Sequence, residues 1–191
     1  KQATCAVSVK KSVVAVTSVT LNKTSLALEK GQSETLTATV LPGNATDKTV
    51  TWSSSDASIA SVDQNGKVTA LKGGNVTITA KAGEQSASCE VRITVPVESI
   101  SLDRTSMTLT EGQTVTLNAT VNPDDATDKT VTWTSSNPSV ASVDQSGQVI
   151  ALDVGNASIV AAVGNKQATC TIVVKGKVSG GHEGTGHESW D

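Results

Sequence analysis

Apolar and polar residues alternate in short segments along most of the chain. One segment carries Leu36, Ala38 and Val40 with a threonine between each pair, and another carries Ile78 and Ala80 in the same way. A period of two places successive side chains on opposite faces of a strand, so one face is buried and the other is exposed to solvent. Turn-forming residues separate the segments at intervals of about 8–12 residues. The pattern predicts an all-β sandwich of about seven short strands per unit of about 80 residues, with almost no helix.

This pattern occurs twice in the chain. The segment Ala45–Trp52 returns letter for letter as Ala126–Trp133, an offset of 81 residues. Cys89 and Cys170 keep the same offset. A period of this length, carried without a gap, indicates a tandem array of one folding unit.

The repeat sets the domain boundaries at residues 15–95 for the first unit and 96–176 for the second. Pro96 lies at the short join, where a proline favours a stiff linker and two units standing end to end. Residues 177–191 are rich in glycine and are interpreted as a tail or linker.

Residues 1–14 precede the first complete unit. The segment Lys1–Cys5 has the same sequence as Lys166–Cys170, which is the predicted last strand of the second unit. Residues 1–14 are therefore interpreted as the closing strand of a truncated preceding repeat, followed by a linker.

Prolines and glycines mark where strands end. Pro42 and Pro123 follow alternating segments, and a proline donates no hydrogen bond to a ladder, so we expect the strands to stop there. Gly66 and Gly147 are expected to supply the positive φ angle of a hairpin turn.

Composition changes the expected core. The chain has no Phe and no Tyr, so we predict that Trp52 and Trp133 are core residues.

Cys89 and Cys170 hold equivalent positions in successive units, too far apart for the separation of about 7 Å that a disulfide allows. We predict that they are free, buried thiols. The alternative is a reactive or metal-binding thiol, although no second Cys or His lies at ligand spacing.

The charges are scattered and nearly balanced. The formal net charge is −3 and the pI is about 5.4. Nucleic-acid binding calls for clustered Lys and Arg, so no nucleic-acid partner is expected. No apolar run approaches the roughly 20 residues of a membrane span, so no membrane insertion is expected.

Several short motifs recur in each unit, among them T-V-T-W, A-S-V-D-x-x-G and a closing A-x-C strand. Together they resemble the bacterial Ig-like domain family of group 2. In the first unit they are Val19/Leu21, Gly31-Gln32, Thr37–Val40, Thr49–Ser55, Ala60–Leu71, Gly74–Ala80 and Ala87–Cys89. The resemblance implies two tandem immunoglobulin-like β-sandwiches in an exported bacterial protein. It also implies stalk or adhesive modules of surface proteins, including surface lipoproteins.

Four aspartates recur at equivalent turns and are candidate calcium ligands: Asp47, Asp63, Asp128 and Asp144. Calcium takes 6–8 oxygen ligands, and no local D-x-D-x-D run supplies them. Aspartate in a turn usually accepts hydrogen bonds from its own backbone. No metal site is therefore predicted.

The only two histidines, His182 and His187, lie in the tail among glycines. A zincin motif places its histidines at i and i+4 on one helix face, whereas these stand at i and i+5. The linker interpretation is therefore preferred. No Ser-His-Asp set can be assembled within a unit, so we expect no catalytic residues, no cofactor and no enzyme activity.

These observations favour a non-catalytic spacer or adhesive module on the bacterial cell surface, which projects or positions a neighbouring binding domain. We expect a monomer in an extended array. The alternative hypothesis is that the repeats themselves bind a host surface protein or polysaccharide. An enzyme-accessory role is a third hypothesis.

Overall fold

The computed structural model describes Ala3, Cys5 and residues 12–177. Apart from Ala3 and Cys5, the predicted strand within residues 1–11 lies outside the described residues, and so does the tail from residue 178 onward. Contacts between Cα atoms divide the chain into unit 1 (Lys1–Pro96 with Asp125–Thr127) and unit 2 (Val97–Asp124 with Asp128–Asp191).

Unit 1 contains nine β-strands and no helix among its described residues. They are β1 (Ser18–Leu21), β2 (Ser25–Glu29), β3 (Ser33–Thr35), β4 (Ala38–Leu41), β5 (Thr51–Ser54), β6 (Ala60–Val62), β7 (Lys67–Ala70), β8 (Gly74–Ala82) and β9 (Gln85–Thr94).

Unit 2 repeats this series of strands, so both units are all-β, as the alternation predicts. Its strands are β10 (Ser99–Leu102), β11 (Ser106–Thr110), β12 (Thr114–Thr116), β13 (Ala119–Asn122), β14 (Thr132–Ser135), β15 (Ala141–Val143), β16 (Gln148–Ala151), β17 (Gly155–Val163) and β18 (Lys166–Lys175).

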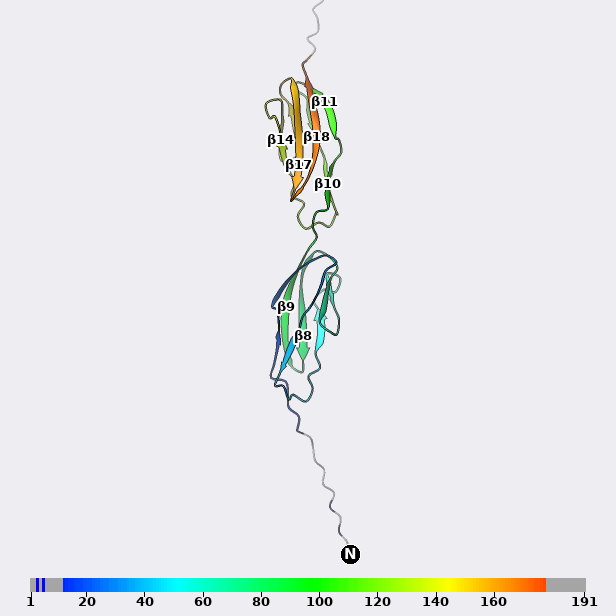
Figure 1. Ribbon diagram of the computed structural model, residues 1–191, viewed down its shortest axis with the longest axis vertical. Helices are drawn as coiled ribbons and strands as arrows, with labels where there is room; N and C mark the ends of the chain where they lie inside the picture. The colour runs from blue at the N-terminus through cyan, green and yellow to red at the C-terminus, as the bar shows by residue number, and fades with distance from the viewer. Residues whose placement is uncertain (1–2, 4, 6–11, 178–191) are drawn as a thin grey trace, which may run out of the picture. The chain divides into compact units, whose positions relative to one another are not determined.

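The strands of unit 1 form two sheets and one strand pair. The four-stranded sheet has the order β2-β9-β8-β5, in which β2 is parallel to β9 and the other neighbours are antiparallel. The second sheet is β3-β7-β6, and β1 pairs with β4. Figure 1 shows β8 and β9 as the long antiparallel strands of this unit. Unit 2 has the same arrangement, with sheets β11-β18-β17-β14 and β12-β16-β15 and the pair β10-β13. The predicted tandem immunoglobulin-like sandwiches are thus confirmed.

Each unit has nine strands where the alternation predicts about seven, because extended segments change partner part-way. β1 pairs with β4, whereas β2, only a few residues later, pairs with β9 in the other sheet. At this change Asn22 Oδ1 accepts a hydrogen bond from Thr37 N at 2.8 Å. In unit 2, Asp103 Oδ1 accepts one from Asn118 N at 3.1 Å. These side chains satisfy backbone donors that the interrupted ladder leaves free.

The alternating apolar side chains make the core of each unit. In unit 1, Leu36, Ile78 and Ile93 are almost fully buried, and their counterparts in unit 2 include Leu117 and Ile159. No polar or charged side chain of residues 12–177 is buried. Burial of aliphatic side chains therefore supplies the main stabilisation of both units.

The predicted strand ends and turns agree with the structure. β4 ends at Leu41 and β13 ends at Asn122, each immediately before its proline. Gly66 and Gly147 have φ angles of 78° and 81°, so each supplies the positive φ that the hairpin requires.

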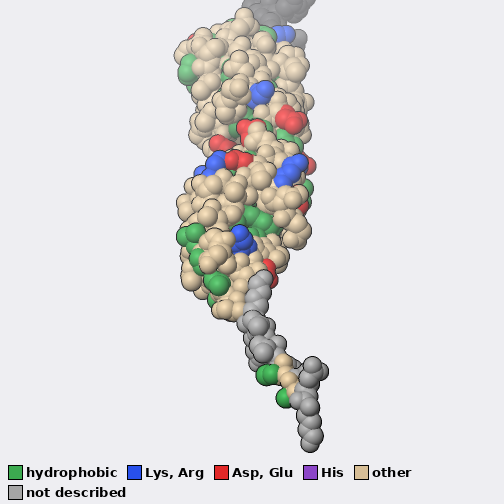
Figure 2. Space-filling view, turned by 60° about the horizontal axis from the view of Figure 1, so that its bottom comes forward, with side chains coloured by type: hydrophobic (Ala, Val, Ile, Leu, Met, Phe, Trp, Pro, Cys, Tyr) green, Lys and Arg blue, Asp and Glu red, His purple; other side chains and the backbone are tan. Residues whose placement is uncertain are grey.

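The surface carries few charges. On the face shown in Figure 2, Lys and Arg side chains are interspersed with Asp and Glu side chains, and no broad patch has one sign. No helix among the described residues is both long and apolar enough to cross a membrane.

Candidate functional site

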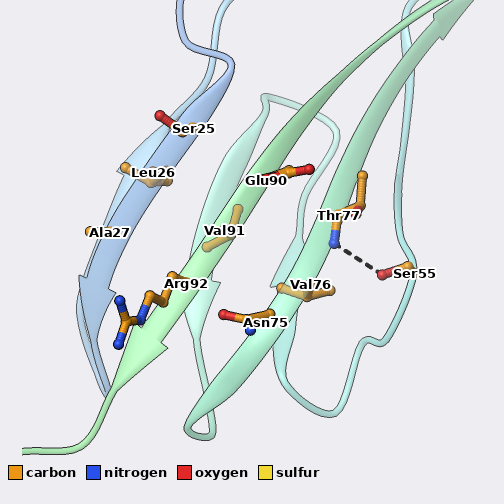
Figure 3. A pocket seen from close by; sticks show the side chains of 10 residues that line it. All are labelled: Ser25, Leu26, Ala27, Ser55, Asn75, Val76, Thr77, Glu90, Val91 and Arg92. Carbon is orange, nitrogen blue, oxygen red and sulfur yellow. Dashed lines mark hydrogen bonds between the residues drawn. The ribbon is translucent and has the colours of Figure 1, made fainter.

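A groove lies on the outer face of the four-stranded sheet of unit 1. Its volume is about 580 Å³, within the range of about 300–1,000 Å³ that small-molecule sites occupy. Figure 3 shows the side chains that line it, which come from β2, β8 and β9 and from Ser55, the residue after β5.

The strand register sets the layout of this groove. Glu90 on β9 stands opposite Ser25 of β2 and Thr77 of β8, so these three residues form one row across the sheet. Arg92 stands opposite Asn75 of β8 in the next row. The intervening residues of the strands, such as Val91, point into the core, because side chains alternate between the faces.

Ser55 closes one side of the groove. Its hydroxyl oxygen accepts a hydrogen bond from Thr77 N at 3.0 Å, and its own N–H donates to the Thr77 carbonyl at 2.9 Å. This pair extends the contact between the β5 segment and β8 beyond the end of the strand, and it holds Ser55 beside the groove (Figure 3).

Two side chains of opposite charge project from β9 in the groove. Glu90 and Arg92 are exposed and lie two residues apart on one face of β9. Neither takes part in an ion pair within residues 12–177. In Figure 3 the Glu90 side chain extends toward β8, and the Arg92 side chain extends toward β2. Both groups are therefore available to a ligand.

Unit 2 keeps three uncharged polar residues of this face and lacks its two charged residues. Ser25, Ser55 and Asn75 have identical counterparts in Ser106, Ser136 and Asn156. The counterparts of Glu90 and Arg92, one repeat later, are Thr171 and Val173. The charged groove is thus a property of unit 1.

The predicted core residues occupy the following places. Cys89 and Cys170 have 0% exposure and are free thiols, and burial raises the pKa of both thiols. Trp133 is 6% exposed. Trp52 is only partly buried and packs against both apolar clusters of unit 1, so it lies at the edge of the core.

The recurring aspartates do not gather into a metal site. Asp63 Oδ1 accepts hydrogen bonds from Asn65 N at 2.8 Å and Lys67 N at 3.0 Å. Asp144 Oδ1 accepts from Ser146 N at 2.8 Å and from Gln148 N at 3.0 Å. Among the residues described, no three His, Cys, Asp or Glu side chains group so as to hold a metal ion.

These turn hydrogen bonds also affect protonation. The backbone N–H groups of Lys67 and Asn65 hold the pKa of Asp63 below its usual value. For Asp144 the largest cause of the lowered pKa is the Ser146 hydroxyl, followed by the Gln148 N–H. Both carboxylates therefore act as turn caps.

The other two aspartates, which belong to the repeated eight-residue segment, act in the same way. Asp47 Oδ1 accepts from Thr49 N at 2.8 Å, and Asp128 Oδ1 accepts from Thr130 N at 2.9 Å. Hydrogen bonds from Thr49 and Thr130 lower the pKa of these two carboxyls as well.

The other residues of the repeated segment also have structural contacts. Ala45 is 7% exposed, and Lys48 Nζ donates to the Gly43 carbonyl at 2.9 Å. Thr46 makes two hydrogen bonds with Val14: its N–H donates to the Val14 carbonyl at 2.9 Å, and its Oγ1 accepts from Val14 N at 2.8 Å. The fold therefore accounts for the strict repetition without a binding role.

Sequence reasoning missed Thr46, Glu90 and Arg92. For Thr46 the signal was the exact repetition of its loop. For Glu90 and Arg92 it was a change of charge between the units at outward positions of an otherwise repeated strand. The tail histidines, His182 and His187, lie outside the described residues.

Comparison with known proteins places this fold in context. A family model of the bacterial Ig-like domain (group 2) matches residues 15–91 and 96–173. An uncharacterised protein of Clostridium acetobutylicum is 48% identical over 172 residues, which cover 87% of this chain and 18% of that protein. An Ig-like virion protein of Serratia phage KSP90 is 36% identical over 170 residues, which cover 84% of this chain and 66% of that protein.

Solved structures show the same fold at low sequence identity. The N-terminal four Ig domains of Dscam1 isoform 6.44 match with a TM-score of 0.55 and 13% identity, over 85% of this chain and 47% of that one. The chain spans less than two thirds of the length of the first relatives it matches, 18% in one case and 25% in another.

Proposed function

The chain belongs to the bacterial Ig-like domain family, group 2, and from this we propose that its two units form a stiff, non-catalytic spacer of an exported bacterial protein. The spacer would hold a neighbouring binding domain at the cell surface. Domains of this family are typically non-catalytic, and the similarity to a virion protein supports a place outside the cell.

The observation that carries this proposal is the pair of hydrogen bonds between Val14 and Thr46. They hold the segment that enters unit 1 against the loop of the repeated eight-residue sequence. Three residues later, Thr17 N donates to the Leu41 carbonyl at 2.8 Å, so the entering segment is held at both ends. Such contacts remove the backbone freedom that a flexible linker would keep.

The same pair of hydrogen bonds is proposed at the join between the two units. Thr127 is the counterpart of Thr46 in the repeated segment, and Val95 is the counterpart of Val14. A loop that is identical in both units would then fix each unit to the segment before it. This arrangement would give a stiff array by the repetition of one local contact.

The chemistry of the units also favours a non-catalytic role. The only histidines of the chain lie in its tail, so neither unit has a histidine base. The buried thiols have raised pKa values, which disfavours the thiolate that a nucleophile requires.

Rotational diffusion tests the spacer directly. Measured by ¹⁵N relaxation on the two-unit chain, both units should tumble with one common correlation time. Thr127→Ala should let them tumble separately, because it removes the proposed acceptor at the join. Thr46→Ala is the matched control, since it frees only the entering segment of unit 1. Two units that already tumble independently in the unmodified chain would refute the spacer.

A further inference from the structure

The groove of unit 1 carries a pair of charges that the fold does not use. Glu90 and Arg92 are exposed and enter no ion pair among residues 12–177. Unit 2 folds in the same way with Thr171 and Val173 at these positions. The two charged side chains are therefore not needed for the folding of the sandwich, and their placement in a groove indicates another role.

The side chains of the groove present donors and acceptors in two adjacent rows. The guanidinium of Arg92 has a planar fork of N–H donors that fits a carboxylate with two parallel hydrogen bonds. Asn75, in the same row, offers both a donor and an acceptor. In the next row the Glu90 carboxylate can accept hydrogen bonds from hydroxyl groups of a ligand. Ser25 and Thr77 stand on either side of Glu90 in this row.

The ligand that fits this set is rich in hydroxyl groups and carries a negative charge. A peptide would pair with an open sheet edge or anchor apolar side chains in pockets. The exposed side chains across these two rows are polar apart from Ala27. The charge of Arg92 is complementary to a carboxylate, and the hydroxyls and the Glu90 carboxylate are complementary to sugar hydroxyls.

We propose that the groove of unit 1 binds an acidic oligosaccharide, with a uronate carboxylate on Arg92 and the hydroxyls of the adjoining sugar on Glu90. No aromatic side chain lines the groove, so no ring stacking contributes. Affinity then depends on the charge-assisted contact at Arg92 and is weak, on the order of 1 mM per site. Unit 2 lacks both charges and does not bind this ligand.

The test is a titration of the ¹⁵N-labelled two-unit chain, in calcium-free buffer, with two probes: oligogalacturonate and hyaluronan oligosaccharides. At least one probe should shift amide signals of β2, β8 and β9, and leave the equivalent strands of unit 2 unchanged. The carboxyl-reduced form of the same probe should bind at least about tenfold more weakly.

Matched variants come from the chain itself. Arg92→Val and Glu90→Thr install the residues of unit 2, and each should weaken binding about tenfold without changing the melting temperature, because both side chains are exposed. Arg92→Lys should restore part of the affinity, since Lys keeps the charge without the planar fork. The double variant Thr171→Glu, Val173→Arg should create a second site on unit 2.

Several results would overturn the proposal. They are the absence of shifts with both probes, shifts outside the groove strands, equal binding of the carboxyl-reduced probe, and unchanged affinity in Arg92→Val. Failure of the binding proposal would not contradict the proposed spacer function, because common tumbling of the two units does not depend on Glu90 or Arg92.

Discussion

A Cβ atom placed on Gly66 would lie 2.7 Å from Cζ2 of Trp52. The same Cβ would clash with the Leu36 carbonyl oxygen, and Gly147 stands in the same relation to Trp133, at 2.9 Å. Each hairpin glycine therefore serves two purposes: it adopts a positive φ, and it leaves room for the indole ring. The turn and the tryptophan depend on each other.

Gly66→Ala should destabilise unit 1 by about 3 kcal/mol, because it adds backbone strain at positive φ to clashes with the Leu36 carbonyl and the indole ring. Gly31→Ala is the matched control. Gly31 also has positive φ, but nothing lies within 4 Å of its added Cβ. Strain alone should cost about 1–2 kcal/mol there. Denaturant unfolding measures both values, and equal losses would show that neither the Leu36 carbonyl nor the indole limits the space beside Gly66.

Trp52→Ala should cost roughly 3–5 kcal/mol and unfold unit 1 while unit 2 remains folded. Trp133→Ala should act on unit 2 and cost more within that range, because Trp133 is 6% exposed and Trp52 is only partly buried. Calorimetry of each variant should therefore show one lowered and one unchanged transition. A Trp52→Ala protein that melts like the wild type would place this side chain outside the core.

Acid should weaken the turns that Asp63 and Asp144 cap. Both carboxyls have a lowered pKa in the folded state. Their contribution is therefore present above the unfolded pKa of about 3.9 and is lost as pH falls through the folded value. In Asp63→Asn and Asp144→Asn, stability should depend less on pH in this acidic range. Unfolding titrations at several pH values provide the measurement, and curves parallel to the wild type would contradict the assignment.

The parts of the fold that depend on local signals were accessible from the sequence. The repeat gave two units, the prolines after Leu41 and Asn122 gave strand ends, and Gly66 gave a turn. The partner change between β1 and β2 was not accessible, because the polar run at residues 22–25 marks a break in the alternation without showing which strands pair on either side of it. The groove was missed because Glu90 acquires its neighbour Ser25 through the parallel pairing of β9 with β2, which is distant in sequence.

We propose that the repeated segment makes the two-unit array stiff. The most direct test is the distance distribution between spin labels at two exposed equivalent positions, Ser88→Cys and Thr169→Cys. Cys5 is replaced by serine, and the buried Cys89 and Cys170 should stay unlabelled. Pulsed dipolar spectroscopy should give one narrow distribution that broadens in Thr127→Ala. A broad distribution in the chain with the intact Thr127 would show a free hinge between the units and contradict the spacer.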